Sequence, residues 1–325
     1  MSSFPEYRPR RLRRTAPLRR AFAETSLQPG NLIAPLFLKE GLSSAAPIPA
    51  MPGHLQHTLE SLVKEARELT ERGIAGLLLF GIPAVKDAEG SSAWAERGIA
   101  QQGLRALREE VGGEVVVIAD LCMCEYTDHG HCGIVNNDQV DNDRTLASYG
   151  RIALSQAEAG ADIVAPSGMM DGQVEAIREH LDGGGFDHIP ILAYAAKYAS
   201  SFYGPFRDAA EGAPRFGDRR GYQQDPPNIE EALREVELDI NEGADAVMVK
   251  PALGYLDVIY AVKQRFAYPT AAYNVSGEYS MLMAAAARGW IDERQATLEV
   301  LTSIRRAGAD LVVTYHAKKA AEWLT

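Results

Sequence analysis

Short apolar runs alternate with longer amphipathic segments along the chain from residue 31 onward. Most of these runs are continuous and rich in Val, Ile and Leu, whereas a half-buried strand would alternate apolar and polar residues. Continuous runs of this kind are typical of parallel strands that are buried on both faces. They predict eight strands, which cover Leu32–Leu38, Gly76–Gly81, Val115–Asp120, Asp162–Pro166, Pro190–Tyr194, Ala246–Lys250, Thr270–Asn274 and Leu311–Tyr315.

Apolar positions at helical spacing predict helices between these strands. Thr58–Arg72 has apolar residues at positions 59, 62, 63, 66 and 69, and Gly73 follows it as a stop signal. Asn228, with Glu231 three residues later, forms a capping-box pattern and predicts a helix that runs to Gly243. The other expected helices cover Glu96–Val111, Arg144–Ala159, Gln173–Leu181, Leu256–Phe266, Ala284–Arg288, Glu293–Ala307 and Lys318–Leu324.

A five-residue pattern, Gly-Ala-Asp-apolar-Val, occurs at 160–164, 243–247 and 308–312. Each copy follows an expected helix and enters an expected strand, so its Gly can end the helix in the left-handed conformation. Repeated strand–helix units predict a (β/α)₈ TIM barrel. We expect residues 31–325 to form this barrel and residues 1–30 to form an N-terminal arm that makes inter-subunit contacts. A doubly wound sheet is the alternative, but no GxGxxG follows the first strand.

Charge is distributed unevenly along the chain. The net charge is −11, which disfavours nucleic acid as the main partner. Residues 1–20 nevertheless contain seven Arg and one Glu. A basic arm on an acidic body could bind RNA or an anionic membrane, but docking on the body itself or on a sister subunit is the interpretation we favour.

The sequence also bears on where the protein works. No apolar run approaches the roughly 18 residues that a membrane span needs, which argues against an integral membrane protein. The basic N-terminal segment is not followed by an apolar stretch, which argues against a signal peptide. Three cysteines, an odd number, suit a reducing compartment better than a disulfide framework. We therefore expect a cytoplasmic protein.

Polar residues gather after the expected strands, where the active site of such a barrel is built. The three cysteines, Cys122, Cys124 and Cys132, all follow the third strand. Thiolates at this spacing can close on one soft cation such as Zn²⁺, and three protein ligands leave a fourth position open, as in catalytic sites. His129 or His131 could complete a closed structural site instead, and three small buried cysteines without a metal are a further alternative.

Two lysines stand at the ends of apolar runs. Lys197 follows the fifth expected strand, and Lys250 ends the sixth. Partial burial of an amine lowers its pKa and frees its lone pair for attack on a carbonyl. One such lysine is more often a solvated surface charge, but two on adjacent barrel strands favour a Schiff-base enzyme.

The segment 198–227, between the two lysines, is rich in Gly, Pro, aromatic residues and Arg and has no helical pattern. A connection of this length inside a compact domain is often a functional lid, and its aromatic residues argue against a disordered insertion. Arg207, Arg219 and Arg220 within it could clamp the carboxylates of small acidic substrates through paired hydrogen bonds.

Together these residues lie in motifs that resemble those of the porphobilinogen synthase family, also called 5-aminolevulinate dehydratases, over nearly the full chain. Any one motif could arise by chance, whereas the whole set is specific. Asp128, Tyr198 and His316 depart from residues that are frequent in the family, but none of them removes a predicted catalytic group. The matching segments are Arg8–Arg14, Cys122–Gly133, Met169–Gln173, Lys197–Arg207, Phe216–Arg220, Val247–Pro251, Val275–Tyr279 and Ala307–Tyr315.

The resemblance implies a hydro-lyase that assembles into homo-octamers and condenses two 5-aminolevulinate molecules into porphobilinogen, an early step of tetrapyrrole biosynthesis. By motif position, Lys197 and Lys250 would each form a Schiff base with one substrate molecule. The resemblance also implies an active-site zinc on Cys122, Cys124 and Cys132, since this chain has all three thiols where some members have aspartates.

The resemblance assigns five further roles. Arg207 and Arg219 would hold the carboxylate of one substrate, while Ser276 and Tyr315 would hold that of the other. Glu235 stands where some members bind an allosteric Mg²⁺. One helix carboxylate with waters is a weak magnesium signature, so an ordinary exposed Glu is the alternative.

In the expected mechanism, each lysine converts a substrate ketone into an iminium, proton loss gives an enamine that forms the C–C bond, and an amine attack forms the C–N bond. Bound zinc would hold or polarise substrate groups. Asp120 and Tyr203 are candidates for proton transfer. A class I aldolase-like lyase is one alternative, but it would need neither three cysteines nor two lysines. A zinc-stabilised scaffold without turnover is another, and it would unfold on chelation.

Overall fold

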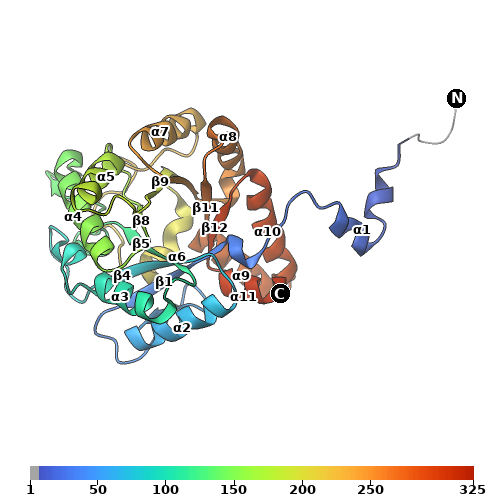
Figure 1. The fold of residues 1–325 in the computed structure, drawn as a ribbon, viewed down its shortest axis with the longest axis horizontal. Helices are drawn as coiled ribbons and strands as arrows, with labels where there is room; N and C mark the ends of the chain where they lie inside the picture. The colour runs from blue at the N-terminus through green and yellow to red at the C-terminus, as the bar shows by residue number, and fades with distance from the viewer. Residues whose placement is uncertain (1–6) are drawn as a thin grey trace.

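Eight parallel strands form a barrel ringed by helices in the computed structural model, which describes residues 7–325 (Figure 1). The strands pair in the order β8-β5-β4-β1-β12-β11-β10-β9, and a parallel bridge between Val164 and Ile191 joins the two end strands. The predicted (β/α)₈ fold is therefore confirmed. The barrel strands are β1 Leu32–Lys39, β4 Gly76–Ile82, β5 Val116–Leu121, β8 Ile163–Pro166, β9 Leu192–Lys197, β10 Ala246–Lys250, β11 Thr270–Asn274 and β12 Leu311–Thr314.

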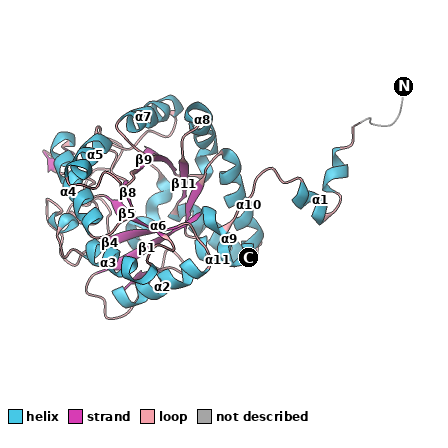
Figure 2. Cartoon of the chain, viewed as in Figure 1, coloured by secondary structure: helices cyan, strands magenta, loops and turns pink. Residues whose placement is uncertain are grey.

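Helices cover the outside of this barrel (Figure 2). They are α2 Leu59–Glu71, α3 Ile99–Val111, α4 Asn142–Glu158, α5 Gln173–Gly183, α7 Ile229–Asn241, α8 Leu256–Phe266, α9 Ser276–Ala287, α10 Glu293–Ala307 and α11 Ala317–Leu324. Shorter elements are η1 Pro9–Arg13, α1 Ala16–Ala21, η2 Pro29–Asn31, β2 Ala46–Pro47, β3 Leu55–His57, η3 Ser91–Trp94, β6 Val135–Asn136, β7 Gln139–Val140, η4 Ser201–Tyr203, α6 Gly204–Ala209 and η5 Leu253–Tyr255.

Three local expectations were wrong. Helix α9 begins at Ser276, eight residues before the predicted start, because the chain turns into a helix directly after β11. Strand β9 runs on to Lys197, past the predicted end at Tyr194. The segment 198–227 was expected to be irregular, but it contains η4 and α6, where Pro205 stands in the first turn and suits a helix start.

The repeated Gly-Ala-Asp pattern has a structural role at the amino-terminal ends of the strands. The Asp backbone N–H donates to a carbonyl on the neighbouring strand, and the Asp carboxylate accepts the N–H of that same residue. The partners are Val117 for Asp162, Ile191 for Asp245 and Thr270 for Asp310, with carboxylate bonds of 2.8–2.9 Å. These two-way pairs fix the register of adjacent strands.

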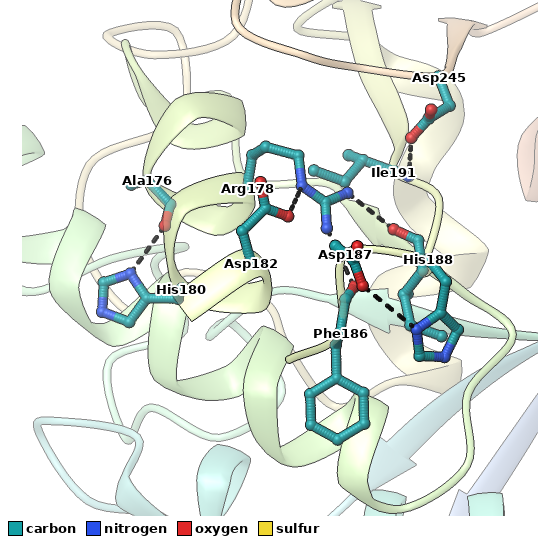
Figure 3. A network of polar contacts seen from close by, with 10 residues as sticks. Ala176, Arg178, His180, Asp182, Phe186, Asp187, His188, Ile191 and Asp245 are labelled. Carbon is teal, nitrogen blue, oxygen red and sulfur yellow. Dashed lines mark hydrogen bonds and ion pairs between the residues drawn. The ribbon is translucent and has the colours of Figure 1, made fainter. Parts of the chain in front are cut away.

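Around the start of β9, Arg178 of α5 makes further hydrogen bonds that hold the strand in place (Figure 3). Its guanidinium donates to Asp182 at 2.7 Å and to the carbonyls of Ile189 and Phe186 at 2.8 and 3.0 Å. The bond from Ile191 to Asp245 lies beside this group (Figure 3). These bonds hold helix α5 against the loop that precedes β9. The carboxyl end of β9 carries Lys197.

The arm lies apart from the barrel (Figure 1). Neither η1 nor α1 has a buried residue, and the arginines at positions 8, 10, 11, 13 and 14 are all exposed. Within residues 7–325, no helix combines the length and the apolar character needed to cross a membrane.

A close backbone approach between α9 and η4 gives a test of the packing. A Cβ on Gly277 would lie 2.5 Å from the Phe202 carbonyl oxygen and 2.7 Å from its Cα, so backbone would have to move. We expect Gly277→Ala to destabilise the fold by about 1–3 kcal/mol. Thermal unfolding followed by circular dichroism measures this. Gly183→Ala is the control, since a Cβ there meets nothing within 4 Å; equal midpoints for the two variants would contradict the packing.

Candidate active site

Lys197 and Lys250 are register partners at the carboxyl ends of β9 and β10. Both side chains are almost fully buried, with 4% and 5% of their surface exposed. Strand alternation from Tyr194 would point Lys197 out of the barrel, because the two are three residues apart. Between residues 193 and 196, however, β9 has one more residue than β10 over the matching stretch. This bulge turns Lys197 inward, beside the Tyr194 ring.

Aromatic rings surround the Lys250 amine. Its Nζ lies 4.3 Å from the ring centre of Tyr273, 5.0 Å from Tyr194, 5.1 Å from Phe206 and 5.3 Å from Tyr203. Burial, and after it the charge of the adjacent lysine, lowers the pKa of Lys250 to about 7. Much of the amine is therefore neutral near pH 7 and has a free lone pair for attack on a carbonyl.

A chain of hydrogen bonds links the second lysine to a carboxyl group. Lys197 Nζ donates to the Ser167 carbonyl, and Ser167 Oγ donates to Asp120 Oδ2 at 3.2 Å. Burial and the charge of Glu125 raise the pKa of Asp120 to about 7, against the effect of both lysines. A carboxyl group that titrates near neutrality beside two amines is suited to proton transfer.

The three cysteines converge in one buried cluster. Their Sγ atoms all lie within 4.8 Å of one another, and Cys122 and Cys124 are 3.4 Å apart. Zinc–thiolate bonds of about 2.3 Å place two sulfurs of a tetrahedral site about 3.8 Å apart, so the cluster fits one zinc ion. Hydrogen bonds from the other two thiols lower the pKa of Cys132 well below its usual value. Cys132 therefore favours the thiolate, the form that binds metal, whereas burial raises the pKa of Cys122 and the bonds to the other thiols raise that of Cys124.

Neither nearby histidine joins this cluster. His131 Nδ1 lies 3.1 Å from the Tyr222 hydroxyl, and its Nε2 lies 3.0 Å from the Phe216 carbonyl. His129 Nδ1 accepts the His131 backbone N–H at 3.1 Å. Because these nitrogens are engaged elsewhere, the geometry favours a three-thiolate site with an open position over a closed site completed by histidine.

The segment 198–227 is called the lid below, and two of its three candidate arginines lie close together. Arg219 is buried and its Nη2 donates to the Gly130 carbonyl at 2.9 Å, which ties the lid to the cysteine loop. Arg207, in α6, is half-buried, and burial followed by the charge of Arg219 lowers its pKa. Neighbouring guanidinium groups of this kind suit a carboxylate ligand. Arg220 is exposed and pairs loosely with Asp218 at 3.9 Å.

Ser276 and Tyr315 each contact a residue whose ring borders Lys250. Ser276 is the first residue of α9, and its Oγ accepts the Phe206 N–H at 3.0 Å. Tyr315 directly follows β12, and its hydroxyl lies 3.0 Å from the Tyr273 hydroxyl. The Phe206 and Tyr273 rings both border Lys250, so each predicted carboxylate-binding hydroxyl bonds a residue that also borders that amine.

Glu235 lies in a different place, on α7. It lines a cleft of about 580 Å³ together with Asp171 and Glu231. Burial, followed by the charges of Asp171, Glu231 and Glu242, raises the pKa of Glu235. A cation would relieve this repulsion, and hard oxygen ligands suit Mg²⁺. The cleft also includes the exposed lid residue Arg220.

Comparison with known proteins identifies the family. Residues 6–323 match the family model described as delta-aminolevulinic acid dehydratase. The delta-aminolevulinic acid dehydratases of Synechocystis sp. and Archaeoglobus fulgidus are 56% and 55% identical to the chain, over 99% and 100% of both proteins. The chain belongs to the delta-aminolevulinic acid dehydratase family. The predicted resemblance is thus confirmed, and membership makes the chain an enzyme, a lyase.

A solved member of the family has the same fold. The crystal structure of delta-aminolevulinic acid dehydratase (porphobilinogen synthase) from Toxoplasma gondii, in complex with the reaction product porphobilinogen, superposes with a TM-score of 0.95. The two sequences are 44% identical, and the match covers 98% of this chain and 92% of that one. Agreement at this level extends over the barrel as a whole.

The structure also reveals neighbours of the lysines that the sequence reasoning missed. Tyr194 and Tyr273 were assigned only to buried strands, yet their rings border Lys250. Tyrosines near the carboxyl end of a barrel strand were the available signal. Tyr203, expected to transfer protons, donates its hydroxyl to the carbonyls of Tyr198 and Lys250 at 2.7 and 3.2 Å, which favours a role in holding the lid.

The lowered pKa of Lys250 leads to a pH prediction for this dehydratase. Its amine is protonated below about pH 7 and cannot attack a ketone, so imine formation should fall roughly tenfold per pH unit there and level off above. Trapping with levulinic acid and borohydride at successive pH values measures the rate, and mass spectrometry assigns the adduct to Lys250. An inflection near about 10.4, the ordinary lysine value, would contradict the prediction.

Proposed function

We propose that this chain condenses two molecules of 5-aminolevulinate into porphobilinogen, with loss of two waters, through Schiff bases on Lys197 and Lys250. The observation that carries the proposal is the pair of buried lysines on adjacent strands, in a member of this family. An ordinary aldolase-type site needs one such amine. Two amines in register match a reaction that must hold two ketones at once.

The lysines supply the covalent chemistry. Each neutral amine attacks a substrate ketone, water leaves, and the resulting iminium draws electrons from the adjacent carbon. Loss of a proton from that carbon gives an enamine, whose carbon attacks the iminium of the other substrate and forms the C–C bond, after which that lysine is eliminated. Attack by a substrate amine on the regenerated iminium forms the C–N bond and expels the other lysine, so both amines return to their starting state. Asp120 would accept and return these protons, because its Oδ2 accepts the hydroxyl of Ser167, the residue whose carbonyl bonds Lys197.

Two sets of groups would orient the substrates. Arg207 and Arg219 would bind the carboxylate of one 5-aminolevulinate by charge-assisted hydrogen bonds. Ser276 and Tyr315 would bind the carboxylate of the molecule attached to Lys250, because each hydroxyl bonds a residue, Phe206 or Tyr273, whose ring borders that amine. Holding each substrate at both ends fixes the two reacting carbons relative to one another.

The cysteine cluster would hold Zn²⁺ through Cys122, Cys124 and Cys132. A zinc ion there would supply a Lewis acid for a substrate amine or a water in its open position. Arg219, on the lid, links this site to the carboxylate-binding groups through its bond to the Gly130 carbonyl. The buried thiol set suits a soft cation and disfavours magnesium at this position.

The remaining assignments concern regulation and assembly. Glu235, with Asp171 beside it in the same cleft, would bind an allosteric Mg²⁺. The exposed basic arm would dock on an acidic sister subunit, as expected in a homo-octamer. We place the enzyme in the cytoplasm, on the reducing environment that three free thiols require.

Turnover and zinc dependence can be tested together. We expect the zinc-loaded protein, incubated with 5-aminolevulinate alone, to form porphobilinogen, detected colorimetrically. Chelation should abolish activity and leave the far-UV circular dichroism spectrum largely unchanged, because the site is catalytic, and added zinc should restore activity. Absence of product with zinc present would favour an aldolase-like lyase. Unfolding on chelation would favour a zinc-stabilised scaffold.

Substitution of Lys250 separates the roles of the two lysines. Lys250→Ala should lose turnover by at least about 10⁴-fold, because the variant lacks one nucleophile. Its thermal midpoint should not fall, since removing a buried amine relieves desolvation. Borohydride reduction with 5-aminolevulinate should then trap substrate on Lys197 only, as read by peptide mass spectrometry. Near-normal activity of the variant would refute the assignment.

A further inference from the structure

Glu278 is a buried carboxylate that none of the roles above uses. It lies in the first turn of α9, two residues after Ser276, and only 3% of its surface is exposed. Its Oε1 accepts the Leu253 N–H at 2.8 Å. Its Oε2 accepts the Val275 N–H at 3.0 Å and the Asn274 side-chain amide at 2.9 Å. Three donors from two loops therefore converge on one carboxylate.

The network continues to a third strand. Thr314, the last residue of β12, donates its hydroxyl to Asn274 Oδ1 at 2.9 Å. The same hydroxyl oxygen accepts the His316 N–H at 3.1 Å. The side chains of Glu278, Asn274 and Thr314 thus form one buried path of hydrogen bonds across the carboxyl ends of β10, β11 and β12.

Each of these three strand ends carries a predicted substrate-binding group. Leu253 comes three residues after Lys250, Val275 directly precedes Ser276, and Thr314 directly precedes Tyr315. The path therefore joins the backbone segments that carry the amine that would bind a ketone and the two hydroxyls that would bind a carboxylate. Glu278 is the member of the path that contacts both the β10 loop and the β11 end.

We propose that Glu278 is a positioning residue that sets the distance between Lys250 and the Ser276–Tyr315 pair, and so selects keto acids of one chain length. This inference rests on the proposed function. In a keto acid the number of carbons between ketone and carboxylate fixes how far apart its two binding groups must be. A buried carboxylate with all its hydrogen bonds made keeps the two groups at a constant distance. Loops without such a contact would let that distance vary.

The chemistry of Glu278 makes it difficult to replace. Both oxygens accept N–H donors, so an amide at this position would direct its own N–H₂ against a backbone or side-chain N–H. A buried donor without an acceptor is unfavourable, and the loop would shift to relieve it. Glu278→Gln is isosteric, so it leaves no cavity. The change in spacing would come from the altered hydrogen bonds alone.

The test compares two keto acids by borohydride trapping on Lys250. The probes are 4-oxopentanoic acid, which has the spacing of 5-aminolevulinate, and 5-oxohexanoic acid, which is one methylene longer. The wild-type enzyme should prefer the shorter acid by roughly tenfold or more, as one-methylene selectivity allows. In Glu278→Gln this ratio should fall to within about threefold, whereas a purely structural role would leave it unchanged.

Two variants keep the result interpretable. Asp162→Asn is the control, because it removes a carboxylate that accepts a backbone N–H at the opposite end of the barrel, between β5 and β8, which carry neither Lys250, Ser276 nor Tyr315; it should keep the wild-type ratio. Thr314→Val removes the hydrogen bond at the far end of the path and should also lower the ratio. This variant keeps the proposal testable if Glu278→Gln fails to fold. An unchanged ratio in Thr314→Val, or in folded Glu278→Gln, would overturn the proposal. Absence of any wild-type adduct would instead refute the Schiff-base function.

Discussion

Two lysine side chains buried next to each other impose the main constraint on this structure. Removing an ammonium group from water is unfavourable, and a second positive charge beside it adds repulsion. The surroundings offset this by accepting a hydrogen bond from Lys197 at the Ser167 carbonyl and by placing aromatic rings around Lys250. The part of this unfavourable free energy that is not offset lowers the pKa of Lys250. A lowered pKa is the property that a Schiff-base lysine needs.

The lid and the cysteine loop support one another around this pair. The lid is fixed to β9 where Gln224 N–H donates to the Lys197 carbonyl at 3.0 Å. On its other side the lid contacts the cysteine loop, through Arg219 to the Gly130 carbonyl and through His131 to the Phe216 carbonyl. The cysteine cluster, Arg219 and Lys197 are therefore parts of a single packed unit. A metal that orders the cysteine loop would also order the lid.

Much of the fold could be predicted because its causes are local. Continuous apolar runs mark strands buried on both faces, and each of the eight predicted runs overlaps one of the eight barrel strands. The Gly-Ala-Asp repeats marked strand entries, and Asp162, Asp245 and Asp310 supply the reason, a two-way pair with the neighbouring strand. The early start of α9 was missed because its first turn packs against η4, where Gly277 lies against the Phe202 backbone, and no local pattern encodes that contact.

By itself, the sequence determined the barrel, the family and which residue types stand after each strand, since these depend on periodicity and on motif chemistry. The tertiary structure alone decided how those residues meet. A one-residue bulge in β9 turns Lys197 inward, where strict alternation would point it outward. Pairing of β11 with β12, in which Asn274 and Thr314 are register partners, brings Glu278, Asn274 and Thr314 into one buried path. Both features arise from pairing between strands distant in sequence, and such pairing leaves no periodic signal in any one segment.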